Sequence, residues 1–268
     1  MIIALIVIIL IALYLLALRG RSGHPQLHML RQWRYAHRGL HRNGVPENSM
    51  AAFCKALERG YGIELDVHLL ADGNLAVIHD ASLKRTAGVG VNIETLTTKQ
   101  LSDYRLEDTE EGIPTFGQVL DLVNGRAPMI VELKSENDNF AELSLAACKM
   151  LEGYQGVYCI ESFDPRCIRW LRKNCPEIIR GQLAHNSLRE RQSPVPYVLR
   201  FIMTNLLSNF WNRPDFIAYR YKDRNRLSVR ICRKLWKIQG VTWTLDTQEA
   251  FNKAVQEEWI PIFEGFEP

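Results

Sequence analysis

From residue 34 onward the chain alternates short apolar runs of strand length with longer segments of helical periodicity, and this alternation limits the possible folds most. The strand-like runs begin near residues 34, 63, 129, 157, 179, 216, 241 and 260. Residues of the types that begin and end helices frame the helical segments, namely Asn48 or Ser49, Gly60, Gly125 and Gly240. Eight strands separated by helices predict an α/β fold, a (β/α)8 barrel of the TIM type, over residues 34–268.

One strand-like run, at residues 76–80, follows the preceding run too closely for a helical connection, which takes about a dozen residues. The Asp-Gly pair at residues 72–73 predicts a tight hairpin between the two runs. Counted outward from the centre of that turn, Asp66 and His79 face each other. They lie on the same side as Glu64, because strand faces repeat every two residues. The sequence therefore predicts that two carboxylates and a histidine meet on one patch.

Carboxylates inside apolar strands are costly unless they are paired with cations or bind a metal. Glu64 and Asp66 have this setting, and so does Glu132, which lies two residues before Lys134 in MIVELKS. One interpretation is an ion-pair network in which Lys134 and Arg38 neutralise the three acids. The other is a site for one hard divalent cation, Mg²⁺ or Ca²⁺, which oxygen ligands suit. Charged strand ends at a common barrel rim are where active sites lie in this fold.

His37 and Arg38 follow one another at the end of the first strand-like run. An ordinary surface turn would explain the pair without any function. The alternative is that the pair handles a phosphate, since an arginine fork binds phosphate oxygens and a histidine transfers protons near neutral pH.

Eight short motifs, in order along the chain, carry a family resemblance. They are AHRG at 36–39, PENS at 46–49, IELDV at 63–67, DG at 72–73, IHD at 78–80, VELK at 131–134, ESFD at 161–164 and WTLD at 243–246. The chain resembles glycerophosphodiester phosphodiesterases from Arg34 onward. The resemblance implies a barrel of the phospholipase-C-like phosphodiesterase type that hydrolyses glycerophosphodiesters to glycerol 3-phosphate and an alcohol. It also implies that a glycerol hydroxyl attacks phosphorus and that water then opens the resulting cyclic phosphate.

By position, the resemblance implies acid–base catalysis by His37 and His79, phosphate binding by Arg38, and metal binding by three acids. These metal ligands are Glu64, Asp66 and Glu132. Which histidine acts first as base stays open at this point.

Three further side chains are expected to contact the substrate for chemical reasons. Lys134 would add a positive charge beside the phosphate. Phe163 and Trp243 lie at strand ends, where they would line a pocket for glycerol, although packing in the core explains them almost as well.

Two segments depart from the family pattern. The chain closes with IPIFEGFEP, where the family has a motif resembling ITDxP, so the rim of the last strand is expected to differ. The stretch PVPYVLRFIMTNLLSNFW at residues 194–211 is unusually apolar for the outer layer of a barrel. It would form either an interfacial helix that sinks its apolar face into lipid, or an outer helix with a broad core-facing side.

The first 18 residues contain no charged side chain and no helix breaker. As a helix they would span about 27 Å, close to the roughly 30 Å of a hydrocarbon core. A cleaved signal peptide is the alternative, but the basic residues follow the apolar run, whereas a signal peptide has them before it. We expect a transmembrane anchor at residues 1–18 and a basic linker at 19–33. The downstream arginines favour a single-pass cell-membrane protein with its catalytic domain on the cytoplasmic side.

Positive charge is concentrated in one stretch. Residues 179–240 hold 13 Lys or Arg against 3 Asp or Glu, about +10, in a chain whose net charge is +3. Such a surface suits a membrane or an anionic ligand, although solvated arginines around a barrel would look the same. No nucleic-acid-binding module accompanies it, so no nucleic-acid partner is expected. The six cysteines include no CxxC pair, so no zinc site is expected.

Two alternative functions remain beside the hydrolysis of soluble glycerophosphodiesters. One is a lysophospholipase D-like or phospholipase-like activity on membrane lipids. The other, from a different class, is a barrel that binds phospholipid headgroups without hydrolysing them. The intact set of motifs disfavours the second, and the oligomeric state is not predicted.

Overall fold

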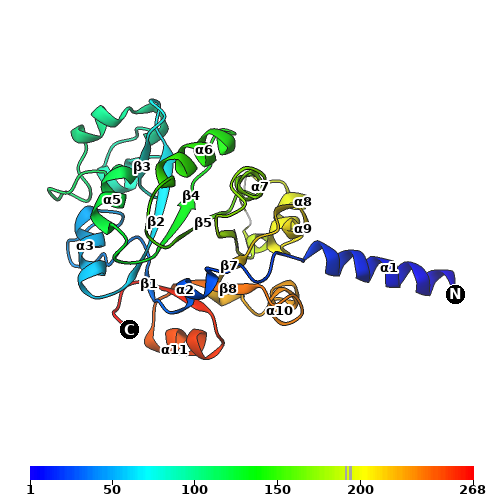
Figure 1. The fold of residues 1–268 in the computed structure, drawn as a ribbon. Coiled ribbons are helices and arrows are strands. Elements are labelled where there is room, and N and C mark those ends of the chain that lie inside the picture. Colours follow the sequence, from blue (N-terminus) through cyan, green and yellow to red (C-terminus); the bar gives the residue numbers. More distant parts are fainter. Residues whose placement is uncertain (191, 193–194) are drawn as a thin grey trace.

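The computed structural model describes residues 1–190, 192 and 195–268, and its central feature is a closed barrel of parallel strands (Figure 1). The barrel strands are β1 Tyr35–Ala36, β2 Gly62–Leu69, β4 Met129–Leu133, β5 Tyr158–Ser162, β6 Arg180–Ala184, β7 Phe216–Arg220, β8 Gln239–Leu245 and β9 Ile260–Phe263. β1 pairs in parallel with both β2 and β9 and so closes the sheet. The predicted TIM-type barrel is confirmed.

Helices cover the outside of the barrel. They are α3 Met50–Glu58, α5 Phe116–Val123, α6 Phe140–Leu151, α7 Pro165–Asn174, α8 Tyr197–Thr204, α9 Asn209–Asn212, α10 Leu227–Lys234 and α11 Gln248–Gln256. Local capping explains several of their starts. Ser49 accepts a hydrogen bond from the backbone N–H of Ala52, and Thr115 forms a capping box with Gln118. Gly240, predicted to end a helix, instead lies inside β8, where a Cβ would clash with the Trp259 ring.

Alternation along the strands separates an apolar outer layer from a mixed interior. Leu65, Val67 and Val131 belong to the large cluster that includes the helices. The opposite face of each strand points into the barrel, because successive side chains alternate. On that face Ile130 is followed two residues later by Glu132, so the interior changes from apolar to acidic toward the carboxyl ends of the strands. This change positions the candidate site.

The amino-terminal end of the barrel is closed by α2, Leu27–Arg31. Leu27 and Leu30 are buried in a cluster with Tyr35 and the lower strand residues, and the Tyr35 hydroxyl donates to the Leu30 carbonyl over 3.2 Å. The segment 19–33, expected to be a basic linker, therefore contains a helix that packs against the barrel.

The hairpin predicted after β2 exists, but its register differs by one residue. β3, Leu75–Val77, pairs antiparallel with β2, and Asp66 lies opposite Ile78. The predicted pairing of Asp66 with His79 was therefore wrong. The loop is one residue longer than a two-residue turn, because Leu70 N–H bonds to Asn74 O over 2.8 Å and Gly73 takes a positive φ of 81°.

After the hairpin, residues 78–115 form an excursion with its own small core. It contains α4 Lys84–Ala87 and the 3-10 helices η1 Ile93–Thr95 and η2 Thr98–Asp103, packed around Leu83, Ile93 and Leu101. Two further 3-10 helices, η3 Ser187–Arg189 and η4 Tyr221–Asp223, follow β6 and β7.

The first helix, α1 Ile2–Ala17, projects away from the barrel (Figure 1). None of its side chains is buried. Its base is fixed to the barrel, because Leu18 is fully buried and the Trp236 indole N–H donates to Leu15 O over 2.9 Å. Among the residues that the structure describes, no helix combines the length and apolar character needed to cross a membrane. The transmembrane anchor expected at residues 1–18 is not confirmed.

The apolar stretch after β6 forms α8, whose only buried residue is Thr204. Tyr197, Val198, Leu199 and Phe201 are exposed. The expected interfacial helix starts at residue 194, and residues 193 and 194 lie outside the described part of the chain.

Candidate active site

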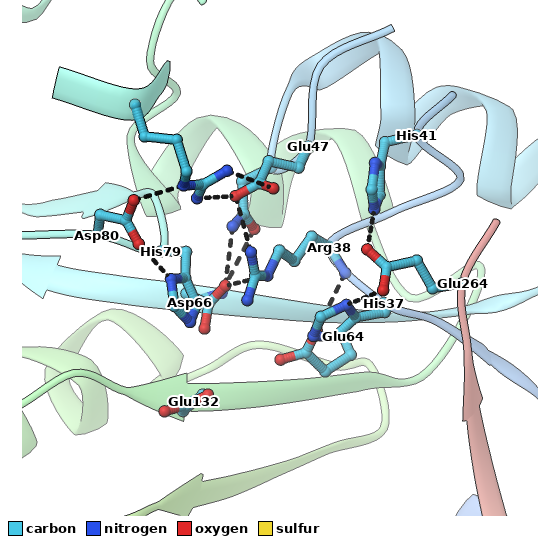
Figure 2. A network of polar contacts seen from close by, with 12 residues as sticks. His37, Arg38, His41, Glu47, Glu64, Asp66, His79, Asp80, Glu132 and Glu264 are labelled. Carbon is cyan, nitrogen blue, oxygen red and sulfur yellow. Dashed lines mark hydrogen bonds and ion pairs between the residues drawn. The ribbon is translucent and has the colours of Figure 1, made fainter. Parts of the chain in front are cut away.

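The charged side chains singled out in the sequence meet at the carboxyl ends of the barrel strands (Figure 2). Register explains much of this convergence, because Asp66 of β2 lies beside Glu132 of β4. His37 comes directly after β1, and its backbone N–H bonds to Phe263 O of β9 over 3.0 Å. His79 follows the end of β3 and lies next to Asp66 (Figure 2). The predicted convergence of Glu64, Asp66 and His79 on one patch is confirmed.

Glu64, Asp66 and Glu132 form a buried carboxylate cluster. Each offers one oxygen such that these atoms lie within 4.8 Å of one another. The side chains are 3%, 1% and 6% exposed, so their charges are poorly screened. Burial, with the neighbouring acids, raises the pKa of Glu64 well above its usual value. Burial raises the pKa of Glu132 to about 7, whereas Lys134 and Arg38 overcome the effect of burial on Asp66 and hold its pKa far below the usual range.

Lys134 and Arg38 supply the cations of the ion-pair network. Lys134 Nζ lies 3.0 Å from Glu132 Oε1 and 3.4 Å from Asp66 Oδ1. Arg38 Nε lies 3.3 Å from Asp66 Oδ2, and its backbone N–H donates to Glu64 Oε2 over 3.0 Å. The predicted ion pairs therefore exist for Asp66 and Glu132, whereas neither cationic side chain forms an ion pair with Glu64.

Glu161 adds a fourth acid that the sequence reasoning did not assign. It lies on β5 beside Glu132, is 1% exposed, and its pKa is raised by burial and by Glu132 and Asp66. Its Oε2 and Asp66 Oδ1 are buried without a hydrogen-bond partner among the described residues. Its sequence signal resembles that of Glu132, because it is an acid within an apolar strand, YCIES.

The donor set fits a hard divalent cation. In the described part of the chain, four carboxyl groups at this cluster face two cationic side chains, Lys134 and Arg38, so these cations cannot balance all four acids in their charged form. Buried carboxyl oxygens without a hydrogen-bond partner, and acids whose charged form is not balanced by nearby cations, are what a divalent metal ion would satisfy. The residues present therefore suit Mg²⁺ or Ca²⁺.

His37 lies between two carboxylates. Its Nε2 faces the buried carboxylate cluster and lies 3.9 Å from Glu64 Oε2, and its Nδ1 lies 3.5 Å from Glu264 Oε2. Glu264 Oε1 also lies 3.1 Å from His41 Nε2. The two histidines beside Glu264 hold the pKa of its carboxyl group well below the usual value. Sequence reasoning missed Glu264, although it had marked the closing segment as a departure from the family.

His79 is held by a chain of hydrogen bonds (Figure 2). Its Nδ1 lies 2.6 Å from Asp80 Oδ1, and the other Asp80 oxygen accepts from Arg85 over 2.6 Å. Arg85 also donates to Glu47, which in turn pairs with Arg38 over 2.9 Å. Burial lowers the pKa of His79, so the neutral imidazole is favoured. Asp80 and Glu47 occur in the motifs IHD and PENS but were not assigned to this chain of contacts.

Phe163 and Trp243 lie together near the same end of the barrel. Phe163 follows β5 directly, and its ring meets those of Trp243 and His185 edge to face, with centroids 5.7 and 5.5 Å apart. Both aromatic side chains are half-buried. Their expected contact with glycerol stays a prediction.

Comparisons with known proteins point in one direction. The model of the "Glycerophosphoryl diester phosphodiesterase family" matches residues 37–263. A "Glycerophosphodiester phosphodiesterase" of Caldanaerobacter subterraneus is 33% identical over 232 residues, covering 82% of this chain and 88% of the relative. "Lysophospholipase D GDPD1" of Rattus norvegicus is 33% identical over 129 residues, covering 42% of this chain and 41% of the relative.

Solved structures resemble the chain in fold. A phosphodiesterase of Oleispira antarctica in complex with sn-glycerol-3-phosphate has a TM-score of 0.71 at 20% identity, over 87% of this chain and 92% of its own. A glycerophosphodiester phosphodiesterase of Parabacteroides distasonis has a TM-score of 0.67 at 23% identity, over 92% and 93%.

Proposed function

The chain belongs to the glycerophosphoryl diester phosphodiesterase family, and from this premise we propose that it hydrolyses glycerophosphodiesters to glycerol 3-phosphate and an alcohol. The observation that supports the proposal most is the buried carboxylate cluster with His37 and His79 beside it. A phosphodiester needs a base for the attacking oxygen, an acid for the leaving alkoxide, and positive charge around the phosphoryl group. The rim of this barrel offers all three.

Glu64, Asp66 and Glu132 would hold one divalent cation, Mg²⁺ or Ca²⁺. When bound, the cation supplies positive charge to the phosphate oxygens and helps to orient the substrate. Arg38 and Lys134 stand beside the same acids, so a phosphate at this position would contact both. Arg38 has five N–H donors, and its contacts with Glu47 and Asp66 leave donors for phosphate oxygens.

His37 and His79 would exchange protons with the two oxygens on either side of phosphorus. Asp80 occupies Nδ1 of His79, so Nε2 is the nitrogen that remains for the substrate. Glu264 lies at Nδ1 of His37 and leaves Nε2 on the side of the carboxylate cluster. One imidazole would take the proton of the attacking glycerol hydroxyl and the other would give a proton to the departing alkoxide. Water would then open the cyclic phosphate with the roles reversed.

Membrane attachment is the second part of the proposal. α1 exposes apolar side chains along most of its length, including Ile2, Ile6, Leu10 and Leu13. A helix with this surface is unfavourable in water and favourable in the acyl region of a lipid layer. We propose that α1 inserts into a membrane and holds the barrel at its cytoplasmic surface, since Arg19 and Arg21 follow it directly.

A lysophospholipase D-like activity is the alternative substrate choice. Two observations favour it, namely the exposed apolar helix and the similarity to the rat lysophospholipase D over 129 residues. The same proton transfers would serve, because the two substrate classes share the phosphodiester and differ in the group attached to it.

The deciding experiment measures glycerol 3-phosphate release from several soluble glycerophosphodiesters, and alcohol release from a lysophospholipid in vesicles, with and without chelator. The proposal expects chelator-sensitive turnover of at least one soluble substrate. Turnover of the lysophospholipid alone would favour the alternative. Binding of either substrate with no turnover at any metal concentration would identify a headgroup-binding barrel.

A further inference from the structure

A basic cavity of about 420 Å³ lies at the base of α1, near the amino-terminal ends of the strands and therefore at the end of the barrel away from the active site. Its arginines come from three parts of the chain and are Arg19, Arg21, Arg172, Arg180 and Arg213. We propose that this cavity binds the phosphate of an anionic phospholipid in the membrane that α1 enters. The inference rests on the membrane attachment proposed above and does not depend on the catalytic activity.

The cavity carries far more positive charge than its partners neutralise. Among the described residues, one carboxylate forms ion pairs with these arginines, namely Asp215, which accepts from Arg21 over 2.7 Å. Arg172 instead donates to the carbonyl of Trp211 over 2.7 Å. Like charges held this close repel one another unless an anion joins them. Burial, together with Arg19 and Arg172, accordingly lowers the pKa of Arg213.

Arg180 gives the strongest support for an anion-binding site here. It is the first residue of β6 and is 2% exposed, yet its guanidinium makes only long contacts of 3.5 Å to the carbonyls of Asn212 and Pro176 among the described residues. Burial and the neighbouring arginines lower its pKa to about 10, so it remains charged at neutral pH. Asp215 accepts from the backbone N–H of Arg180 over 3.0 Å, and its charge partly offsets the lowering of the pKa, but among the described residues no carboxylate forms an ion pair with the Arg180 guanidinium. A buried guanidinium without an ion pair is costly, and a phosphate oxygen would reduce that cost.

The position of the cavity relative to α1 identifies the occupant. Leu18 is buried at the junction, and its carbonyl accepts from Asn209 over 3.4 Å, so the helix leaves the barrel at a fixed point. Arg19 and Arg21 follow within three residues. When a lipid layer takes up the exposed part of α1, its headgroups come level with this junction. Anionic phospholipid headgroups attract basic groups placed there.

Gly20 makes this geometry possible. A Cβ at Gly20 would come within 2.5 Å of the carbonyl oxygen of Pro214, so only glycine lets the chain pass this close to the start of β7. Arg19 and Arg21 are thereby held on the cavity beside Arg213. The close packing at Gly20 therefore fixes where the segment after α1 places its two arginines.

The test compares binding of the full chain to two kinds of vesicle. One consists of neutral phosphatidylcholine, and in the other phosphatidylglycerol, which is anionic, makes up about a quarter of the lipid. The altered protein carries Arg172→Gln and Arg213→Gln, which lie at the surface side of the cavity. The control carries Arg126→Gln and Lys149→Gln, which are exposed and do not line it. Turnover of a soluble glycerophosphodiester is measured for all three, and it should be equal because the cavity is remote from the catalytic rim.

We expect the anionic lipid to strengthen binding of the unaltered chain and of the control alike. The Arg172/Arg213 change should reduce affinity for the anionic vesicles on the order of 10- to 30-fold, at about fivefold per cation, and leave binding to neutral vesicles unchanged. Native mass spectrometry from detergent should retain one phosphatidylglycerol on the unaltered chain and none on the altered one.

Three results would overturn the proposal. Equal losses in the altered protein and the control would show that overall charge, not this cavity, attracts the lipid. Binding to no vesicle at all would remove membrane attachment and this site together, while leaving the catalytic proposal to its own turnover assay. Stabilisation of the unaltered chain by millimolar inorganic phosphate, lost in the altered one without any change in vesicle binding, would mean that the cavity binds free phosphate.

Discussion

At the scale of single residues, charge balance determines how the catalytic rim works. Lys134 is shared between Glu132 and Asp66, and Arg38 between Asp66 and Glu47. Among the described residues no lysine or arginine side chain is therefore left to pair with Glu64, which accepts the backbone N–H of Arg38. The ion pairs therefore orient the acids without neutralising them. This explains how an ion-pair network and a metal site can occupy the same place.

The first prediction concerns Glu64. Glu64→Gln keeps the shape of the side chain but removes its charge, so metal binding and activity should both be lost while the barrel stays folded. Added Mg²⁺ or Ca²⁺ should raise the melting temperature of the unaltered chain, because ligand binding stabilises the native state, and should not raise that of the variant. Glu136→Gln, at an exposed position, is the control. Full activity after exhaustive chelation would rule out the metal role.

The second prediction concerns proton transfer and the phosphate fork. His37→Ala and His79→Ala should each lower kcat on the order of 10²- to 10⁴-fold, as expected when a group that transfers a proton is lost. Arg38→Lys should also be harmful, because an ammonium cannot reproduce the planar fork. Steady-state turnover with a soluble glycerophosphodiester measures all three. Near-normal turnover by His79→Ala between pH 5 and 9 would contradict the assignment.

The third prediction concerns Glu264 as a positioning residue for His37. Glu264→Gln should lower kcat on the order of 10- to 100-fold, the range found when the carboxylate behind a functional histidine is removed. KM and the melting temperature should change little, because Glu264 is 35% exposed and faces histidines rather than the phosphate. Glu264→Asp, which restores the charge, should recover part of the rate. Equal losses in both variants would indicate that the side chain serves only packing.

The metal-site residues that the sequence could identify share one property: each is a charged side chain in an otherwise apolar segment. Glu64, Asp66 and Glu132 are acids inside apolar strands, and that conflict is visible without coordinates. Glu264 could not be found in this way, because it follows β9 at the rim, where an acid is unremarkable. Its function comes from the closure of the barrel, which brings β9 next to β1 and His37.

At the scale of elements, the strands were predictable and the connections less so. Eight apolar runs matched eight barrel strands, because a strand that is buried on both faces must be apolar nearly throughout. The hairpin register shifted because Gly73 allows a longer loop, and Gly240 lies in a strand because it makes room for Trp259. Both details depend on neighbours that are distant in sequence. The interfacial role expected for α8 stays a prediction, although its apolar face is exposed.

The fourth prediction concerns α2, which the sequence had placed within a linker. Leu30 is 1% exposed in the cluster that closes the barrel, whereas its neighbour Met29 is 41% exposed. Leu30→Ala should therefore lower the free energy of unfolding by about 2–5 kcal/mol, and Met29→Ala should change it little. Denaturant titration of both variants provides the comparison. Equal stabilities would show that α2 is a dispensable linker.

At the scale of the whole molecule, two ends of the barrel carry two kinds of charge. The carboxyl ends of the strands gather acids around a candidate cation site, and the amino-terminal ends gather arginines beside α1. Two of the thirteen basic residues in the stretch 179–240, Arg180 and Arg213, line the cavity at the amino-terminal ends. Under the proposed attachment, a membrane would hold one part of the barrel while soluble substrates reach another.

The last prediction separates attachment from catalysis. Deleting residues 2–13 removes the exposed part of α1 and keeps Tyr14 to Leu18, which touch the barrel. Melting temperature and turnover of a soluble glycerophosphodiester should therefore be unchanged. Binding to neutral vesicles should be lost, because each apolar side chain that lipid buries contributes about 1.5–3 kcal/mol.

Weak binding of the shortened chain to anionic vesicles at low salt should persist through α8 and the arginines, and Val198→Ser with Phe201→Ser should reduce it. Leu145→Ser with Val255→Ser, exposed elsewhere on the barrel, should not. Undiminished binding to neutral vesicles after the deletion would mean that another surface attaches the enzyme.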